Sequence, residues 1–425
     1  MPRIRPLLNP VTLTLDGEAI LAEKGEPIAV ALLAAGKLGI ARSPKFHRPR
    51  GPSCLRGACD GCLARVDEVP NTMTCMVGAT DGCAIVTQNR LGPRQADLLR
   101  LTDWFFPEGM NHHELFAGVP GVQTIMQTFA RRVAGLGRLP TEVEPARPAK
   151  RREVDVVVVG AGPSGMAVAV AAAEAGRHVE VLDDQLVLGG ALGALSPEDA
   201  APFLSLRDRF DALSKDEKIK VRAHTTVGAI YGRDVLVVGA DGAEVLEPRA
   251  LILACGGHDA ALAFEGNDIP GVMSARAAGW LLHRHGVVPG KNIVVIVPPG
   301  GVGARFGDSY ARAAKHHAKV VRIEGELVGV SGTLRVKKVR VKVDGKEKSV
   351  DADLVVIDAP RAPAFELAQQ AGAKLEHRPE GFVVLRDEDG RIAEGTWAVG
   401  EVAGVPFDAA AMQADAAKLV AALQG

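Results

Sequence analysis

Four cysteines crowd into one short segment and have the spacing of an iron–sulfur ligand set. Cys54, Cys59, Cys62 and Cys75 follow the pattern C-x4-C-x2-C-x12-C. The first three match the plant-type run, in which a tight loop aims thiolates at one [2Fe-2S] cluster and a more distant fourth cysteine completes it. Zinc sites also use four cysteines, but they usually present two short pairs, whereas the fourth cysteine here stands alone. The spacing therefore favours a [2Fe-2S] cluster, with zinc as the alternative.

The residues around these cysteines suit a cluster loop. Gly51, Gly57 and Gly61 would let backbone N–H groups approach cluster sulfides closely. Upstream, residues 45–51 (KFHRPRG) form a basic run with two interpretations. It is either a solvated loop or a rim that offsets an anionic cluster or contacts a phosphate-bearing cofactor of a partner. Cys83 is predicted to be a buried, packing thiol rather than a ligand.

These N-terminal motifs resemble those of a known family. The segments KFHRPRG and SCLRGACDGCLARVDEVPNTMTC are similar to the α subunits of heteromeric amino-acid and amine dehydrogenases, a group that includes sarcosine oxidase, opine oxidases, hydroxyproline dehydrogenases and hydrogen cyanide synthase. The resemblance implies a ferredoxin-like domain in which Cys54, Cys59, Cys62 and Cys75 hold the metal. It also implies a hetero-oligomer with a flavoprotein β subunit of the amino-acid or amine oxidase type, and it allows an FMN at a subunit interface.

A glycine-rich motif after a run of valines predicts dinucleotide binding. Residues 160–165 (GAGPSG) open a helix of small residues. In this motif Gly160 makes the turn, Gly162 admits the pyrophosphate and Gly165 lets helix and strand pack closely. The phosphate then lies at the helix N-terminus. A second strand ends at Asp183, whose carboxylate is placed to accept from ribose hydroxyls, although Asp184 could substitute and either could cap a helix instead.

Three later motifs resemble those of two-dinucleotide flavoproteins. They are Leu188-Gly189-Gly190, the turn at 254–257 (ACGG), and residues 395–401 (GTWAVGE). In that family the last motif places an acid against the ribityl chain, and Glu401 stands here where Asp is commoner. The resemblance implies FAD as a cofactor. The predicted cofactor-binding residues are Gly160, Gly162, Pro163, Ser164, Gly165, Asp183, Asp184, Gly189, Gly190, Ala254, Gly256, Gly400 and Glu401.

A second nucleotide-binding half is less complete. The strand Ile293–Val297 runs into PPGGVGARFG, in which two prolines lack the N–H donors that a phosphate cradle uses. Gly301 and Gly303 could still line a phosphate turn, with Glu324 as the ribose acid. We favour a degenerate nicotinamide domain kept for structure or subunit contact, which leaves NAD(P) doubtful as a cofactor.

The elements that must position these residues follow from local patterns. Two short apolar runs flank Asp16-Gly17 and predict a β-hairpin, followed by a helix over 28–35. Strands and helices then alternate from residue 154, as in a parallel sheet. The predicted fold class is α/β, with an N-terminal β-grasp and a Rossmann-like FAD domain that carries an inserted, reduced NAD-like domain. The predicted bounds are 1–100 for the β-grasp, 101–152 for an arm and linker, 153–270 with 361–425 for the FAD domain, and 271–360 for the insert.

Composition excludes several function classes. The 425 residues include 50 Lys plus Arg against 51 Asp plus Glu, which argues against nucleic acid or an anionic membrane as the main partner. The apolar window 154–173 is broken by Pro163 and glycines, so we predict no membrane span. Because we recognise no signal peptide either, we expect a cytoplasmic protein.

The predicted function is that of a redox subunit. In this scheme a partner flavoprotein would oxidise an amine or amino acid, and electrons would pass between that flavin, the [2Fe-2S] cluster and the FAD bound here. No residue of this chain is predicted as a catalytic base, which fits a substrate site elsewhere. Two alternatives stay open, namely a stand-alone NAD(P)H-dependent reductase and a non-catalytic assembly subunit.

Overall fold

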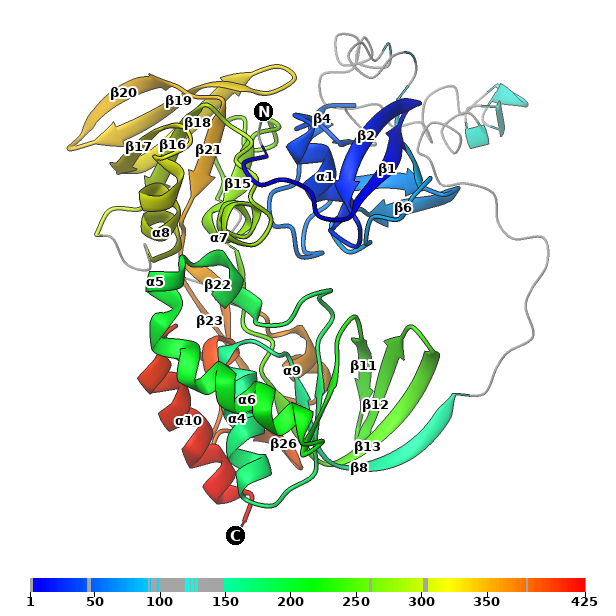
Figure 1. Ribbon diagram of the computed structural model, residues 1–425, viewed down its shortest axis with the longest axis vertical. Coiled ribbons are helices and arrows are strands. Elements are labelled where there is room, and N and C mark those ends of the chain that lie inside the picture. Colours follow the sequence, from blue (N-terminus) through cyan, green and yellow to red (C-terminus); the bar gives the residue numbers. More distant parts are fainter. Residues whose placement is uncertain are drawn as a thin grey trace. The chain divides into compact units, whose positions relative to one another are not determined.

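The chain forms two units, each built from two separate stretches of sequence (Figure 1). One unit comprises Met1–Val143 with Leu262–Ala359, and the other comprises Glu144–Ala261 with Pro360–Gly425. The computed structural model describes residues 3–43, 47–90, 149–259, 262–300, 305–379 and 381–424, together with a few positions between 92 and 128. Lys45, Phe46, Gly301, Gly303 and nearly all of the predicted arm lie outside the described residues.

The first unit begins with the predicted β-grasp. Its sheet has the order β2-β1-β7-β5-β6, in which β1 and β2 form the predicted hairpin and β1 pairs in parallel with β7. Asp16 and Gly17 both have positive φ, 51° and 85°, as a two-residue primed turn requires. Leu13, Leu15 and Ile20 are buried, as are the apolar side chains of helix α1. The elements are β1 (Pro10–Leu15), β2 (Glu18–Glu23), α1 (Ile28–Ala34), β3 (Ala41–Arg42), β4 (Pro49–Arg50), β5 (Leu63–Val66), β6 (Val69–Met73) and β7 (Ala84–Val86).

The inserted segment supplies the rest of this unit. Four parallel strands in the order β15-β21-β16-β17 form its sheet, and β18, β19 and β20 form a separate antiparallel meander. Residues 262–270, which the sequence analysis assigned to the FAD domain, fall in this unit, and the N–H of Val330 in the meander donates to Glu265 O at 2.7 Å. The elements are β15 (Val272–Ser274), α7 (Ala275–Gly279), the π-turn η4 (Trp280–Arg284), β16 (Asn292–Val297), α8 (Arg305–Ala314), β17 (Lys319–Glu324), β18 (Glu326–Gly332), β19 (Val336–Val343), β20 (Lys346–Asp351) and β21 (Leu354–Ile357).

The second unit is a Rossmann-like α/β fold. Strands β10, β9, β8, β13 and β26 pair in parallel in that order, and β12 and β11 extend β13 as an antiparallel meander. The predicted strand–helix–strand unit over 154–182 is confirmed. The elements are β8 (Lys150–Val159), α4 (Pro163–Glu174), β9 (Val179–Leu182), η2 (Gly190–Ala194), α5 (Pro197–Ala200), η3 (Ala201–Phe203), α6 (Leu204–Lys215), β10 (Ile219–Arg222), β11 (Thr226–Tyr231), β12 (Asp234–Gly239), β13 (Gly242–Leu253), β14 (Gly257–Asp259), β22 (Arg361–Pro363), α9 (Glu366–Gln370), β23 (Leu375–Arg378), β24 (Gly381–Val384), β25 (Arg391–Ala393), β26 (Thr396–Ala398), η5 (Gly400–Ala403) and α10 (Ala409–Ala422).

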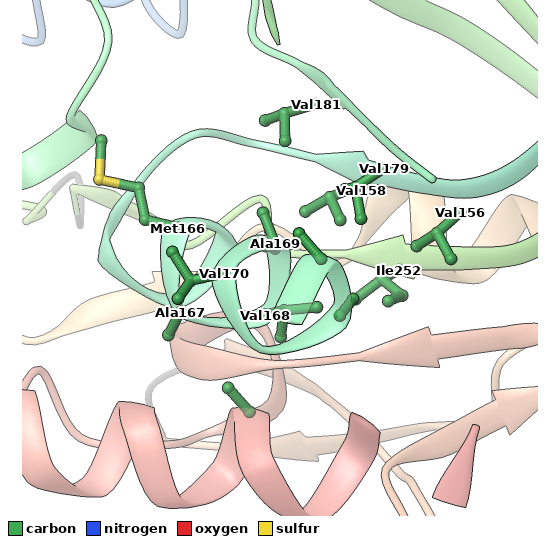
Figure 2. Packing of buried hydrophobic residues seen from close by; sticks show 14 of the residues in the cluster. Val156, Val158, Met166, Ala167, Val168, Ala169, Val170, Val179, Val181 and Ile252 are labelled. Atoms are coloured by element: carbon green, nitrogen blue, oxygen red, sulfur yellow. The ribbon is translucent and has the colours of Figure 1, made fainter. Parts of the chain in front are cut away.

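The valine run of β8 is buried on both sides of the sheet. Val156 and Val158 belong to a cluster with α4, as Figure 2 shows, whereas Val157 and Val159 belong to a second cluster with Val235 and Val237 of β12. Helices α6, α4 and α10 lie together over the first cluster (Figure 1). Burial on both faces explains why the strand reads as a continuous apolar run rather than an alternating one. Within the described part of the chain, no helix has the length and apolar character needed to cross a bilayer.

Strand β8 begins earlier than the sequence suggested. Lys150 to Arg152 were expected to end an exposed linker, yet they pair with the first residues of β13. Arg152 donates to Glu180 at 2.6 Å and to Glu244 at 3.0 Å. These ion pairs hold charged residues in the ladder, so the linker prediction was wrong for its last residues.

Candidate cofactor sites

The four predicted metal ligands meet as two pairs of thiols. Cys54 is hydrogen-bonded to Cys59, and Cys62 to Cys75. In each pair this bond lowers the pKa of one thiol, Cys59 or Cys62, and raises the pKa of its partner. No three His, Cys, Asp or Glu side chains among the described residues converge as ligands of one ion. The two pairs also interact with each other electrostatically, so the four thiols lie near one another, as a [2Fe-2S] cluster requires.

Backbone donors surround these sulfurs. The cluster loop, residues 51–62, connects β4 to β5. Its Gly57 N–H donates to Cys75 Sγ at 3.3 Å, and its Arg56 N–H donates to Cys54 Sγ at 3.5 Å. N–H groups aimed at sulfur stabilise the thiolate form that a metal cluster needs. The residues present therefore fit a [2Fe-2S] cluster.

His47 and Arg50 of the basic run before the loop have different roles. His47 is buried, its Nδ1 lies 2.9 Å from Asn89 O, and its carbonyl accepts from Arg42 at 2.8 Å. Arg50 Nε lies 3.9 Å from the Asp60 carboxylate in the cluster loop. His47 thus has a packing role, while Arg50 places a cation beside the loop.

The cluster loop also rests on the inserted segment of the same unit. The N–H of Ser274, at the end of β15, donates to Ser53 O at 3.0 Å. A Cβ added at Gly51 would lie 3.2 Å from the Cα of Pro270, so the backbones approach closely there. Since Ser53 precedes Cys54, the insert fixes the peptide plane that leads into the first ligand.

A proline test isolates this backbone contact. Ser274 has φ −70° and ψ 154°, which proline can adopt, and its side chain caps α7 by accepting from the Ala277 N–H. Ser274→Ala removes the cap, at a cost of about 1 kcal/mol, but keeps the N–H. Ser274→Pro removes the cap and the N–H. We expect anaerobic iron loss to a chelator to be about fivefold faster in Ser274→Pro than in the wild-type chain, and unchanged in Ser274→Ala, because only the proline variant loses the hydrogen bond to Ser53. Equal rates in the two variants would contradict this role for the insert.

The glycine motif of the second unit has the predicted geometry. Gly160 has φ 106°, and an added Cβ there would lie 2.5 Å from Ala254 O. A Cβ at Gly165 would lie 1.8 Å from Gly160 O, so this residue must be glycine for helix α4 to pack. By contrast, a Cβ at Gly162 would meet nothing within 4 Å. That open space lies at the N-cap of α4, where a pyrophosphate would approach.

The structure separates the two candidate ribose acids. Asp183 is buried, its Oδ2 accepts from the Ala161 N–H at 2.6 Å, and its Oδ1 accepts from the Gln185 N–H at 2.9 Å. Asp184 is exposed and accepts from the Gln185 side chain. A carboxylate offers about four lone-pair positions, so Asp183 can accept ribose hydroxyls while it holds the loop. Its position favours Asp183 over Asp184.

The remaining predicted residues gather near the start of α4. A Cβ at Gly190 would lie 3.0 Å from Gly162 Cα, and one at Gly400 would lie 2.1 Å from Ser164 Oγ. A Cβ at Gly256 would lie 4.0 Å from Glu401 Oε2. Motifs far apart in the sequence are thus brought to one place in this unit.

Two residues of this region escaped the sequence analysis. Arg361 forms an ion pair with Glu401 at 2.6 Å, and Asp415 accepts from the Gly400 N–H at 3.1 Å. Neither belongs to a recognisable motif. Arg361 follows the insert directly, so only the fold brings it to the last flavin motif.

The second nucleotide-binding half is partly described. The Gly300 N–H donates to Glu324 Oε1 at 3.1 Å, and Glu324 also faces Arg322 at 3.6 Å. At the start of α8, the buried Asp358 carboxylate accepts from the Gly307 N–H at 2.6 Å. The Asp358 carboxylate therefore holds an amide in the first turn of α8.

The two remaining cysteines lie apart from the ligand pairs. Cys83 is buried as predicted, and burial raises the pKa of its thiol to about 11. Cys255 is partly buried, with its Sγ 4.0 Å from Val159 O. Both fit a packing role.

Comparison with known proteins agrees with both sites. Residues 9–90 match a family described as a 2Fe-2S iron-sulfur cluster binding domain, and residues 155–207 match one described as FAD dependent oxidoreductase. The crystal structure of L-proline dehydrogenase from P. horikoshii shares the fold, with a TM-score of 0.74 and 20% identity over 100% of this chain and 75% of that one. The predictions of the fold class, of FAD and of a [2Fe-2S] cluster are thereby confirmed.

Two curated relatives place the chain more closely. The sarcosine oxidase alpha subunit of Rhizobium meliloti (strain 1021) is 28% identical over 407 residues, which cover 86% of this chain and 41% of that subunit. An opine oxidase subunit of Agrobacterium tumefaciens (strain Ach5) is 26% identical over 332 residues, which cover 63% of this chain and 64% of that one. The chain thus spans less than half the length of the sarcosine oxidase subunit. The chain combines an N-terminal [2Fe-2S] domain with an FAD-dependent oxidoreductase domain, and it is similar to these sarcosine oxidase and opine oxidase subunits.

Proposed function

We propose that this chain is the redox subunit of a heteromeric amine or amino-acid oxidase or dehydrogenase. It would relay electrons between a partner flavoprotein of the amino-acid or amine oxidase type, its [2Fe-2S] cluster and its own FAD. A flavin accepts hydride pairs and a cluster passes single electrons, so the two groups supply complementary redox chemistry. The observation that carries the proposal is the presence of a four-thiol site and a dinucleotide site in one chain.

Each site is proposed with defined protein groups. Cys54, Cys59, Cys62 and Cys75 would hold the two irons, and backbone N–H groups of the cluster loop would keep the thiolates ionised. The start of α4 would receive the FAD pyrophosphate at Gly162, and Asp183 would accept from the ribose. Glu401 would face the ribityl chain. The predicted division into a β-grasp, an FAD domain and an insert stays part of this proposal, with the connecting arm ending before β8 (Lys150–Val159).

The partner is proposed from the relatives, which are themselves named as subunits of oxidases. The amine substrate would be oxidised on that partner. The predicted cytoplasmic location and an FMN at the subunit interface stay predictions. No nicotinamide role is proposed for the insert.

Anaerobic spectroscopy tests the proposal. The chain is purified alone and with a candidate flavoprotein partner of the amino-acid or amine oxidase type, and flavin and cluster absorption are followed after a donor is added. We expect bleaching by an amine or amino acid only when the partner is present. Rapid bleaching of the isolated chain by NADH would instead identify a stand-alone reductase. Colourless protein, or cofactors that stay oxidised with every donor in a stable complex, would also contradict the proposal.

A further inference from the structure

We propose that Arg361 is a positioning residue of the flavin site, which holds Glu401 by one carboxylate oxygen and leaves the other directed toward bound FAD. The proposal rests on the FAD role of Glu401 proposed above. Arg361 belongs to none of the flavin motifs, and its part in the site follows from the contacts of the folded chain alone.

Two nitrogens of Arg361 contact the same oxygen of Glu401. Both Nε and Nη2 of Arg361 lie 2.6 Å from Glu401 Oε1. Oε2 instead faces Gly256, where an added Cβ would lie 4.0 Å away. The Arg361 and Glu401 side chains are 14% and 13% exposed, so water screens their attraction little. Such a pair fixes the carboxylate in both charge and orientation.

The fold carries Arg361 to this place. Arg361 is the first residue of β22, which pairs antiparallel with β14, so that Arg361 lies opposite Asp259. Strand β14 follows Gly256 directly, and Gly256 is one of the predicted flavin residues. The chain therefore leaves the flavin site after Gly256 and returns from the insert at Arg361.

An aromatic side chain supports the guanidinium. The Arg361 Cζ lies 5.9 Å from the centroid of the Phe407 ring, within the range of a cation–π contact. Phe407 in turn packs on the buried Phe203, with ring centroids 5.3 Å apart. Phe407 thus contacts the Arg361 guanidinium, whose N–H groups donate to Glu401.

The length of the glutamate side chain makes such an anchor useful. Glutamate has several rotatable bonds, and therefore rotamer freedom to lose on binding a ligand. A fixed guanidinium removes that freedom before FAD arrives. Pre-organisation of this kind raises affinity without adding a contact to the ligand.

A double-mutant cycle tests the proposal with FAD affinity as the readout. Arg361→Gln, Glu401→Gln and the double variant are prepared as apo-protein and titrated with FAD, and the melting temperature of each apo-protein is recorded. We expect each single change to weaken FAD binding by about 10- to 100-fold. The double variant should bind no worse than the single ones, because both changes remove one interaction. Arg361→Lys should recover part of the affinity.

A second ion pair in the same unit provides the matched control. Arg177 and Asp155 lie 2.7 Å apart with 26% and 23% exposure, outside the predicted flavin motifs. Arg177→Gln should lower the melting temperature and leave FAD affinity within about twofold. Wild-type affinity in Arg361→Gln, or additive effects in the cycle, would overturn the role of Arg361. Failure of the wild-type chain to bind FAD would instead overturn the proposed flavin site.

Discussion

Replacing Cys75 by serine is expected to remove the cluster and leave the flavin in place. Serine keeps the size of the side chain but lacks the thiolate that iron requires, and its loss leaves Cys62 without its partner. Iron and acid-labile sulfide should fall from about two per chain to near zero. The flavin content should be unchanged, because the proposed FAD residues belong to the other unit. Iron assay, sulfide assay and flavin release from one sample measure both quantities.

Cys83 provides the control for this experiment. It is buried and belongs to neither of the two ligand pairs. Cys83→Ser should therefore retain both irons, at a modest cost in stability. Iron retained in Cys75→Ser, or lost equally from both variants, would refute the assignment of the ligands.

Two neighbouring glycines are expected to respond differently to alanine. At Gly162 the backbone is extended and the space around an added Cβ is open, so Gly162→Ala should fold normally. The methyl group would occupy the place proposed for the pyrophosphate and weaken FAD binding by about 10- to 100-fold. At Gly165 an added Cβ would lie 1.8 Å from Gly160 O, which backbone cannot accommodate without shifting. Gly165→Ala should therefore lower the free energy of unfolding by about 3 kcal/mol.

The two alanine variants are compared by FAD titration and by the thermal unfolding of each apo-protein. The informative result is a separation of the two effects, with affinity lost in Gly162→Ala and stability lost in Gly165→Ala. If Gly162→Ala bound FAD as tightly as the wild-type chain, the pyrophosphate would have to lie elsewhere.

Features set by neighbouring residues were predictable from the sequence. The Asp16-Gly17 turn follows from two residues that tolerate positive φ, and the meeting of the four cysteines follows from their spacing. Strand β20 (Lys346–Asp351) was not predicted, because its residues are polar and mostly exposed. It is a strand because it pairs with β19, which is a property of the folded chain.

Contacts between distant residues set the limit of prediction at the sites. The sequence singled out Glu401 but not Arg361, because their meeting depends on the antiparallel return of β22 along β14. The pairing of Cys54 with Cys59, and of Cys62 with Cys75, likewise depends on how the cluster loop folds back. Motifs identify the predicted ligands, but which of these residues contact one another is determined by the folded chain.

The discontinuous flavin unit implies an order of cofactor loading during synthesis. The strands of the β-grasp and the four cysteines are synthesised first, well before Ser274 of the insert, whose N–H contacts the cluster loop. Gly160 and Gly400 belong to one site, but a long segment that includes the insert separates them. At about 5–20 residues per second, the ribosome reaches Gly400 roughly ten seconds or more after Gly160. The four thiols can therefore meet iron before the insert steadies the cluster loop, whereas FAD must wait until η5 has left the ribosome.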